Sequence, residues 1–111
     1  MAEHGTIRIP DHEYKERVQR AAAILVRENL DVMIVNGNEA DYANPRYFSG
    51  FWPLFERAGV AIAANGDAAL LVGPESSVFG ADRNKLDKIF TLLAYREGAN
   101  PAYPELKPDT F

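Results

Sequence analysis

Apolar side chains at helical spacing mark the first element of the chain. They are Tyr14, Val18, Ala21, Ala22 and Leu25. Steps of three and four residues place such side chains on one helix face, and acid-first pairs such as Glu13–Arg17 support the opposite, charged face. We therefore expect a helix from Asp11 to Glu28, with Asp11 as its N-cap, preceded by a leader at residues 1–10.

The next apolar run is short and unbroken. Val32–Val35 follows Asp31 without a polar interruption, which is typical of a strand buried on both faces. The sequence Asn-Gly-Asn at 36–38 predicts a turn. After it, Asn38 or Asp41 is a candidate N-cap for a short helix.

Two apolar runs joined by Asn65-Gly66 give the clearest local signal. Val60–Ala64 and Ala68–Val72 predict the strands of a hairpin, with positive φ at both residues of the Asn-Gly turn. Pro74 to Ala81 is expected to be helical, and 82–87 to form a loop or a short helical turn. Lys88–Tyr95 is rich in β-forming residues and predicts the last strand.

This order of elements predicts an α/β domain. Helix, strand, short helix, hairpin, helix and strand favour a sheet that mixes parallel and antiparallel pairs. The prolines at 101, 104 and 108 indicate an irregular tail over residues 100–111. The domain proper is therefore expected to span residues 11–99.

Half of the aromatic side chains fall in one broken segment. They are Tyr42, Tyr47, Phe48, Phe51, Trp52 and Phe55. Pro45 fits the first position of a short helix that Gly50 would end. Tyr47 and Phe48 are expected in the core, whereas the residues from Phe51 onward are expected in an exposed connection. Such a segment can serve a core or a binding lip.

Composition excludes several classes of function. A net charge of −4 is the wrong sign for a general nucleic-acid binder. The absence of cysteine rules out disulfides, a thiol nucleophile and thiolate metal sites. No apolar run reaches the roughly 20 residues of a membrane helix, and the N-terminus lacks a signal-peptide pattern. We therefore expect a cytoplasmic protein without a membrane partner.

The residue patterns give no catalytic or metal-ligating set. His4 and His12 have no carboxylate at ligand spacing, and no Gly-rich phosphate loop or nucleophile motif is present. Asp31, Asp41 and Asp67 border turns, where capping explains them. We predict that this chain alone is not an enzyme and holds no cofactor.

The motif "NPRYFSGF" and its surroundings resemble a known family. Asn44, Tyr47, Phe48, Ser49, Gly50 and Phe51 match an Asn-x-x-Tyr-(Leu/Phe)-(Thr/Ser)-Gly-Phe pattern. Asn29-Leu30-Asp31 precedes it, and an apolar hairpin with Pro74-Glu75 follows it. Over about Glu13 to Tyr95 the chain is similar to the N-terminal domain of the creatinase/prolidase/aminopeptidase P family. In that family these motif residues are structural.

The resemblance implies a single three-layer-like domain with a mixed sheet flanked by helices. It also implies a second, C-terminal domain, absent here, that carries the catalytic residues and a divalent metal (Mn, Co or Zn). The chain would then be the non-catalytic N-terminal part of an Xaa-Pro peptidase and would support homodimerisation. A creatinase-like amidinohydrolase and a free-standing α/β binding module remain as alternatives.

The resemblance also indicates substrate-contacting residues. Phe55-Glu56-Arg57 is similar to a Phe-x-Arg that reaches the substrate across the creatinase dimer. An arginine there can bind a carboxylate bidentately, and Trp52 or Phe55 can cover a prolyl ring. The alternative is that Trp52 and Phe55 pack against the partner domain or the dimer mate without touching substrate.

Overall fold

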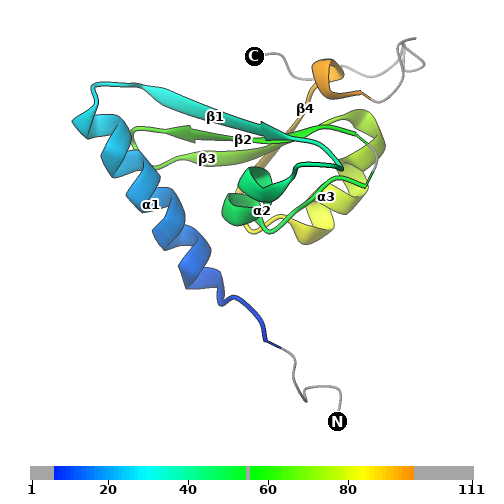
Figure 1. The fold of residues 1–111 in the computed structure, drawn as a ribbon, viewed down its shortest axis with the longest axis horizontal. Coiled ribbons are helices and arrows are strands. Elements are labelled where there is room, and N and C mark those ends of the chain that lie inside the picture. The colour runs from blue at the N-terminus through cyan, green and yellow to red at the C-terminus, as the bar shows by residue number, and fades with distance from the viewer. Residues whose placement is uncertain (1–6, 55, 97–111) are drawn as a thin grey trace.

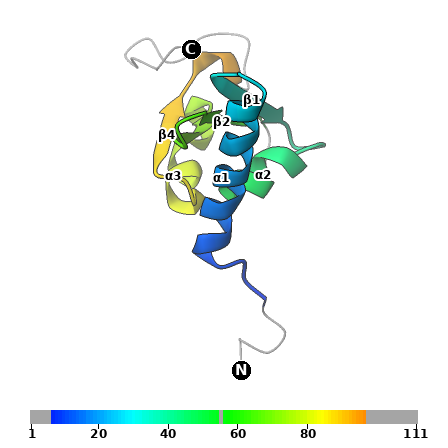
Figure 2. The same ribbon diagram turned by 90° about the vertical axis from the view of Figure 1, so that its left-hand side faces the viewer.

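In the part of the chain that the structure describes, a four-stranded mixed sheet carries three α-helices on one face. The structure is a computed structural model that describes residues 7–54 and 56–96. Its strands lie in the order β1 (Val32–Gly37), β2 (Ala58–Ala63), β3 (Ala68–Val72) and β4 (Lys88–Thr91), with two antiparallel pairs followed by one parallel pair. Figures 1 and 2 show the helices α1 (Asp11–Arg27), α2 (Ala43–Ser49) and α3 (Ser77–Arg83) on the same side of this sheet. Within the described ranges, none of the helices has the length and apolar character needed to span a bilayer.

The first helix, α1 (Asp11–Arg27), has the predicted buried stripe. The predicted N-cap is wrong, because Pro10 occupies that position in an extended conformation and Asp11 is already helical. A carboxylate in the first turn still interacts favourably with the helix dipole. At the other end, Asn29 turns the chain with a positive φ of 58°.

Strand β1 (Val32–Gly37) lies at one edge of the sheet. The expectation of burial on both faces is wrong: Val32 and Ile34 are 53% and 43% exposed, whereas Met33 and Val35 pack on the core. An edge strand with helices on one side needs only alternate apolar positions. Asn36 and Gly37 belong to the strand, so the predicted turn begins only at Asn38.

The predicted hairpin is present as β2 (Ala58–Ala63) and β3 (Ala68–Val72). Of the two residues of the turn, only Gly66 has a positive φ, 96°, so the prediction for Asn65 is wrong. Gly66 N–H donates to the Ala63 carbonyl, and the Asn65 side chain accepts a hydrogen bond from the amide of Asp67. The longer loop therefore needs only one left-handed residue.

The last strand is shorter than predicted. A 3₁₀ turn, η1 (Pro74–Ser76), leads into α3 (Ser77–Arg83), which connects to β4 (Lys88–Thr91) in parallel with β3. Instead of continuing to Tyr95, the chain forms the 3₁₀ turn η2 (Leu93–Tyr95). Leu92 and Tyr95 pack there with Leu71 in a second, smaller apolar cluster.

The core lies between the hairpin and the helices. Val60, Ile62, Leu70 and Val72 are completely buried and pack with the apolar stripe of α1. The mixed sheet with flanking helices confirms the predicted fold class. In the described part of the chain, the three α-helices form one layer, and η2 packs on the opposite face. The predicted 100–111 tail lies outside the described residues, as does most of the leader.

The inner face of β3 should dominate stability. We expect Leu70→Ala to reduce the free energy of unfolding by roughly 2–5 kcal/mol, because it leaves a cavity where the side chain is fully buried. Val32→Ala, on the exposed side of β1, is the matched control and should change it by less than about 1 kcal/mol. Urea unfolding of the two variants measures the difference. Equal losses would contradict this assignment of the core.

Candidate functional site

The aromatic segment begins with α2 (Ala43–Ser49), whose end is fixed by a buried serine. Ser49 Oγ donates to the Pro45 carbonyl at 2.7 Å and accepts from the Phe51 amide at 3.1 Å. Gly50 ends the helix as predicted, with a left-handed φ of 75°. The expectation that Phe51 is exposed is wrong: it is 2% exposed and belongs to the core. The sharp turn at Gly50 directs it inward.

Other local predictions for this segment need correction. Helix α2 starts at Ala43 with Tyr42 as its N-cap, so Pro45 is the third helical residue rather than the first. Its missing N–H costs nothing there, because the first four amides of a helix have no intrahelical partner. Asn38 is not the N-cap of a helix. Its side chain instead accepts hydrogen bonds from the amides of Ala40 and Asp41, within the loop before α2.

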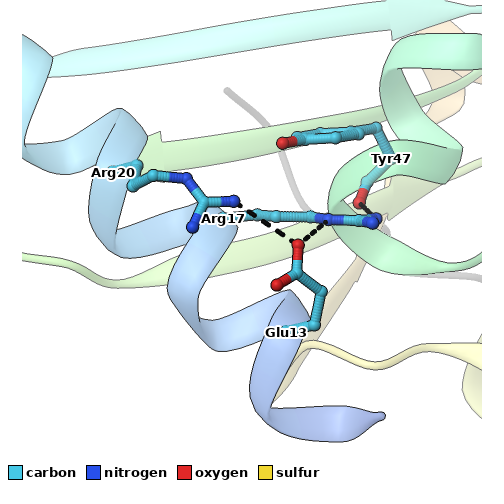
Figure 3. Close-up of polar contacts among 4 residues, drawn as sticks. All are labelled: Glu13, Arg17, Arg20 and Tyr47. Carbon is cyan, nitrogen blue, oxygen red and sulfur yellow. Dashed lines mark hydrogen bonds and ion pairs between the residues drawn. The ribbon is translucent and has the colours of Figure 1, made fainter. Parts of the chain in front are cut away.

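Arg17 joins α1 to α2 (Figure 3). Its guanidinium donates to the Glu13 carboxylate at 2.9 Å and to the Tyr47 carbonyl at 2.7 Å. It also lies 4.2 Å from the centre of the Tyr47 ring. The hydrogen bond from Arg17 lowers the pKa of Glu13. Tyr47 was expected in the core, but it is 44% exposed and packs against this arginine.

An open hollow of about 840 Å³ lies beside α2, and we call it the Trp52 hollow. It lies between the residues before α1, the first half of α1, α2 and the loop before α2. Its lining residues that carry chemistry are Arg8, Tyr14, Arg17, Asp41, Tyr42, Arg46, Tyr47, Trp52 and Lys85. Arg46 lies over the half-buried Trp52, with Cζ 4.5 Å from the ring centre. Cationic and aromatic groups thus face the same space.

Arg57 lies in a second hollow, of about 530 Å³, which we call the Arg57 hollow. Its lining is mainly polar and includes Asn36, Asn38, Asp41 and Tyr95. Asp41 lines both hollows, so the two are neighbours. Two of the three predicted substrate-contacting residues, Trp52 and Arg57, therefore face separate spaces. The third, Phe55, lies outside the described residues.

The sequence analysis did not single out Glu56, although among the residues that the structure describes it is the one buried residue that carries a charge. It is 4% exposed, and neither carboxylate oxygen makes a hydrogen bond. Oε2 would lie only 2.6 Å from a Cβ atom added at Gly73. Burial raises the pKa of Glu56 to about 7, with a further contribution from the neighbouring Glu75 carboxyl and an opposing one from Ser76. Glu56 lies in a bend two residues before β2, and its neighbours in the sequence form no pattern that signals its burial.

The remaining motif residues line no catalytic cluster. Asn44 is exposed at the start of α2, and Phe48 packs on the core. Among residues 7–54 and 56–96, no group of three or more histidine and carboxylate side chains is arranged to hold a metal ion. The chemistry available here is recognition by guanidinium, aromatic and amide groups.

The raised pKa of Glu56 should make stability depend on pH. Between about pH 4.5 and 7 the folded state binds a proton at Glu56 that the unfolded state has lost, so stability falls as pH rises through this window. For the unaltered chain, we expect the free energy of unfolding to fall by roughly 1–3 kcal/mol between pH 5 and pH 8, as measured by urea unfolding. The Glu56→Gln variant, which cannot ionise at this position, should lack this decrease. The exposed Glu39→Gln is the control. If the free energy of unfolding of the Glu56→Gln variant fell by the same amount between these pH values, Glu56 would not be the source of the pH dependence.

Comparison with known proteins identifies the family. Residues 17–110 match the Creatinase/Prolidase N-terminal domain. No curated protein sequence matches the chain. Crystal structures that share its fold include the following three, and the chain spans 57–60% of their length.

The three structures come from different bacteria. One is an N-terminal, creatinase/prolidase-like domain from Corynebacterium diphtheriae (19% identity over 71% of this chain and 59% of that one, TM-score 0.59). The second is an Xaa-Pro aminopeptidase from Streptococcus pyogenes (15% identity over 77% of this chain and 60% of that one, TM-score 0.61). The third is an Xaa-Pro aminopeptidase from Streptococcus thermophilus (24% identity over 72% of this chain and 57% of that one, TM-score 0.58). Since the family match covers most of the chain, the chain belongs to the creatinase/prolidase N-terminal domain family.

Proposed function

We propose that this chain is the non-catalytic N-terminal domain of a cytoplasmic Xaa-Pro peptidase. The family match over residues 17–110 carries the proposal, and two of the three structures described above are Xaa-Pro aminopeptidases. In this proposal the reaction takes place on a C-terminal domain, which holds a divalent metal (Mn, Co or Zn). The present domain supports a homodimer and shapes the entrance to the active site.

The Arg57 hollow supports the role at the entrance. Arg57 is exposed, and its planar guanidinium suits bidentate binding of a carboxylate. Asn36 and Tyr95 line the same hollow and are hydrogen-bonded to each other, the tyrosine hydroxyl donating to Asn36 Oδ1. This contact holds the wall of the hollow in place. A peptide substrate offers the carboxylate and amide groups that such a lining recognises.

The alternative of a creatinase-like amidinohydrolase uses the same arginine for another carboxylate. The two are distinguished by the substrate that the full-length parent protein hydrolyses. Creatine hydrolysis without Xaa-Pro cleavage would overturn the peptidase proposal, and the absence of any catalytic domain in the parent gene would favour a binding module.

We predict that the 111-residue chain alone does not hydrolyse Xaa-Pro peptides when Mn²⁺, Co²⁺ or Zn²⁺ is added. The expected reason is that the metal and catalytic groups lie on another domain. Release of the N-terminal residue from a fluorogenic Xaa-Pro substrate measures the activity, with the full-length parent as the positive control. Turnover that persists through repurification of the chain would contradict the proposal.

In the full-length parent, we expect Arg57→Ala to lower kcat/KM about tenfold, mainly through a higher KM, because one charge-assisted contact is lost. The melting temperature should change little, since the side chain is exposed. Arg27→Ala, at the exposed end of α1, is the matched control. Kinetics equal to those of the unaltered parent would rule out a substrate contact by Arg57.

A further inference from the structure

Two guanidinium groups in the Trp52 hollow have no carboxylate partner in the described part of the chain. Arg8 and Arg46 both line this hollow, and neither forms an ion pair there. Arg46 instead lies 4.5 Å above the Trp52 ring. A cation held against an aromatic ring keeps its N–H donors available at the ring edge. The hollow therefore presents two charges that a ligand can neutralise.

The other cations of the hollow are already engaged. Arg17 is mostly buried and binds the Glu13 carboxylate and the Tyr47 carbonyl. Lys85 Nζ lies 3.3 Å from the Asp11 carboxylate. Arg17 and Lys85 therefore line the hollow with charges that are already paired within the domain. Arg8 and Arg46 remain as the groups that can contact an anion.

The walls between these charges are aromatic. Tyr14, Tyr42, Tyr47 and Trp52 all line the hollow. Flat side chains of this kind offer apolar surface with few rotatable bonds. We propose that the Trp52 hollow binds a monoanionic carboxylate ligand whose flat ring packs against the aromatic wall of the hollow and whose carboxylate is held by Arg46 and Arg8.

Charge favours a carboxylate over a phosphate. Asp41 also lines the hollow, and the chain carries a net charge of −4, so a second negative charge on the ligand would be repelled. The carboxylate can belong to a free aromatic acid or to the C-terminus of a peptide, since both offer the same group. The proposal does not rest on the peptidase function, because Arg57 lies in the other hollow.

Trp52 is the only tryptophan, so its fluorescence reports on this hollow alone. We expect hippurate (benzoylglycine) to change that fluorescence saturably when it is added to the chain. Hippuramide, which lacks the charge, should bind at least tenfold more weakly, and 0.5 M NaCl should weaken hippurate binding. Acetyl-Gly-Phe with a free carboxylate tests the peptide source: tighter binding than hippurate indicates a peptide C-terminus, and weaker binding a free acid.

Variants locate the site. Arg46→Gln and Arg8→Gln should each weaken hippurate binding about tenfold, whereas Arg27→Gln, outside the hollow, should leave it unchanged. Arg8 precedes α1, so its substitution tests the charge without altering the stacking on Trp52. The proposal is overturned if hippuramide or inorganic phosphate binds as tightly as hippurate, if both variants retain the original affinity, or if hippurate gives no saturable change.

Discussion

The whole domain depends on burial of the inner face of the β2–β3 hairpin. Val60, Ile62, Leu70 and Val72 project from this face and are completely buried. Helix α1 covers them with its own apolar stripe, and α2 and α3 pack on the same side of the sheet (Figure 2). Since burial of each such side chain stabilises the fold by about 1.5–3 kcal/mol, this layer fixes where the three helices lie. Both hollows lie at its margins, so their shape follows from the core.

Arg17 determines which charges on this framework can act on a ligand. Two of its donors are used within the fold, where they connect the charged side of α1 to the backbone of α2 (Figure 3). A guanidinium that is mostly buried and bonded at two sides has little freedom to bind anything else. Without this contact, Tyr47 would lose the group on which it packs. Arg17 thus holds the Tyr47 ring in the wall of the Trp52 hollow, and Arg8 and Arg46 are the arginines that bind the ligand carboxylate.

Much of the fold could be predicted from local patterns, because those patterns record burial. The stripe of α1, the hairpin around Gly66 and the stop at Gly50 each follow from one face or one backbone angle. The errors concern tertiary context. Nothing within Val32–Val35 indicates that it is an edge strand, and nothing in Leu92–Tyr95 indicates that packing on Leu71 replaces a longer strand. The inward direction of Phe51 depends on the turn at Gly50 and on the space below it.

The candidate site was less predictable, because neighbouring residues face different environments. Glu56 and Arg57 are adjacent, yet one is buried against Glu75 and Gly73 while the other is exposed in a hollow. The middle position of a Phe-x-Arg motif is unspecified, so the motif predicts nothing about it. In this chain the middle residue is Glu56, a carboxyl group that is buried. Burial of an ionised carboxylate is costly, so the proton that Glu56 retains near neutral pH helps to keep this residue inside. Because Glu56 is held in the interior, the position from which Arg57 extends into solvent is fixed as well.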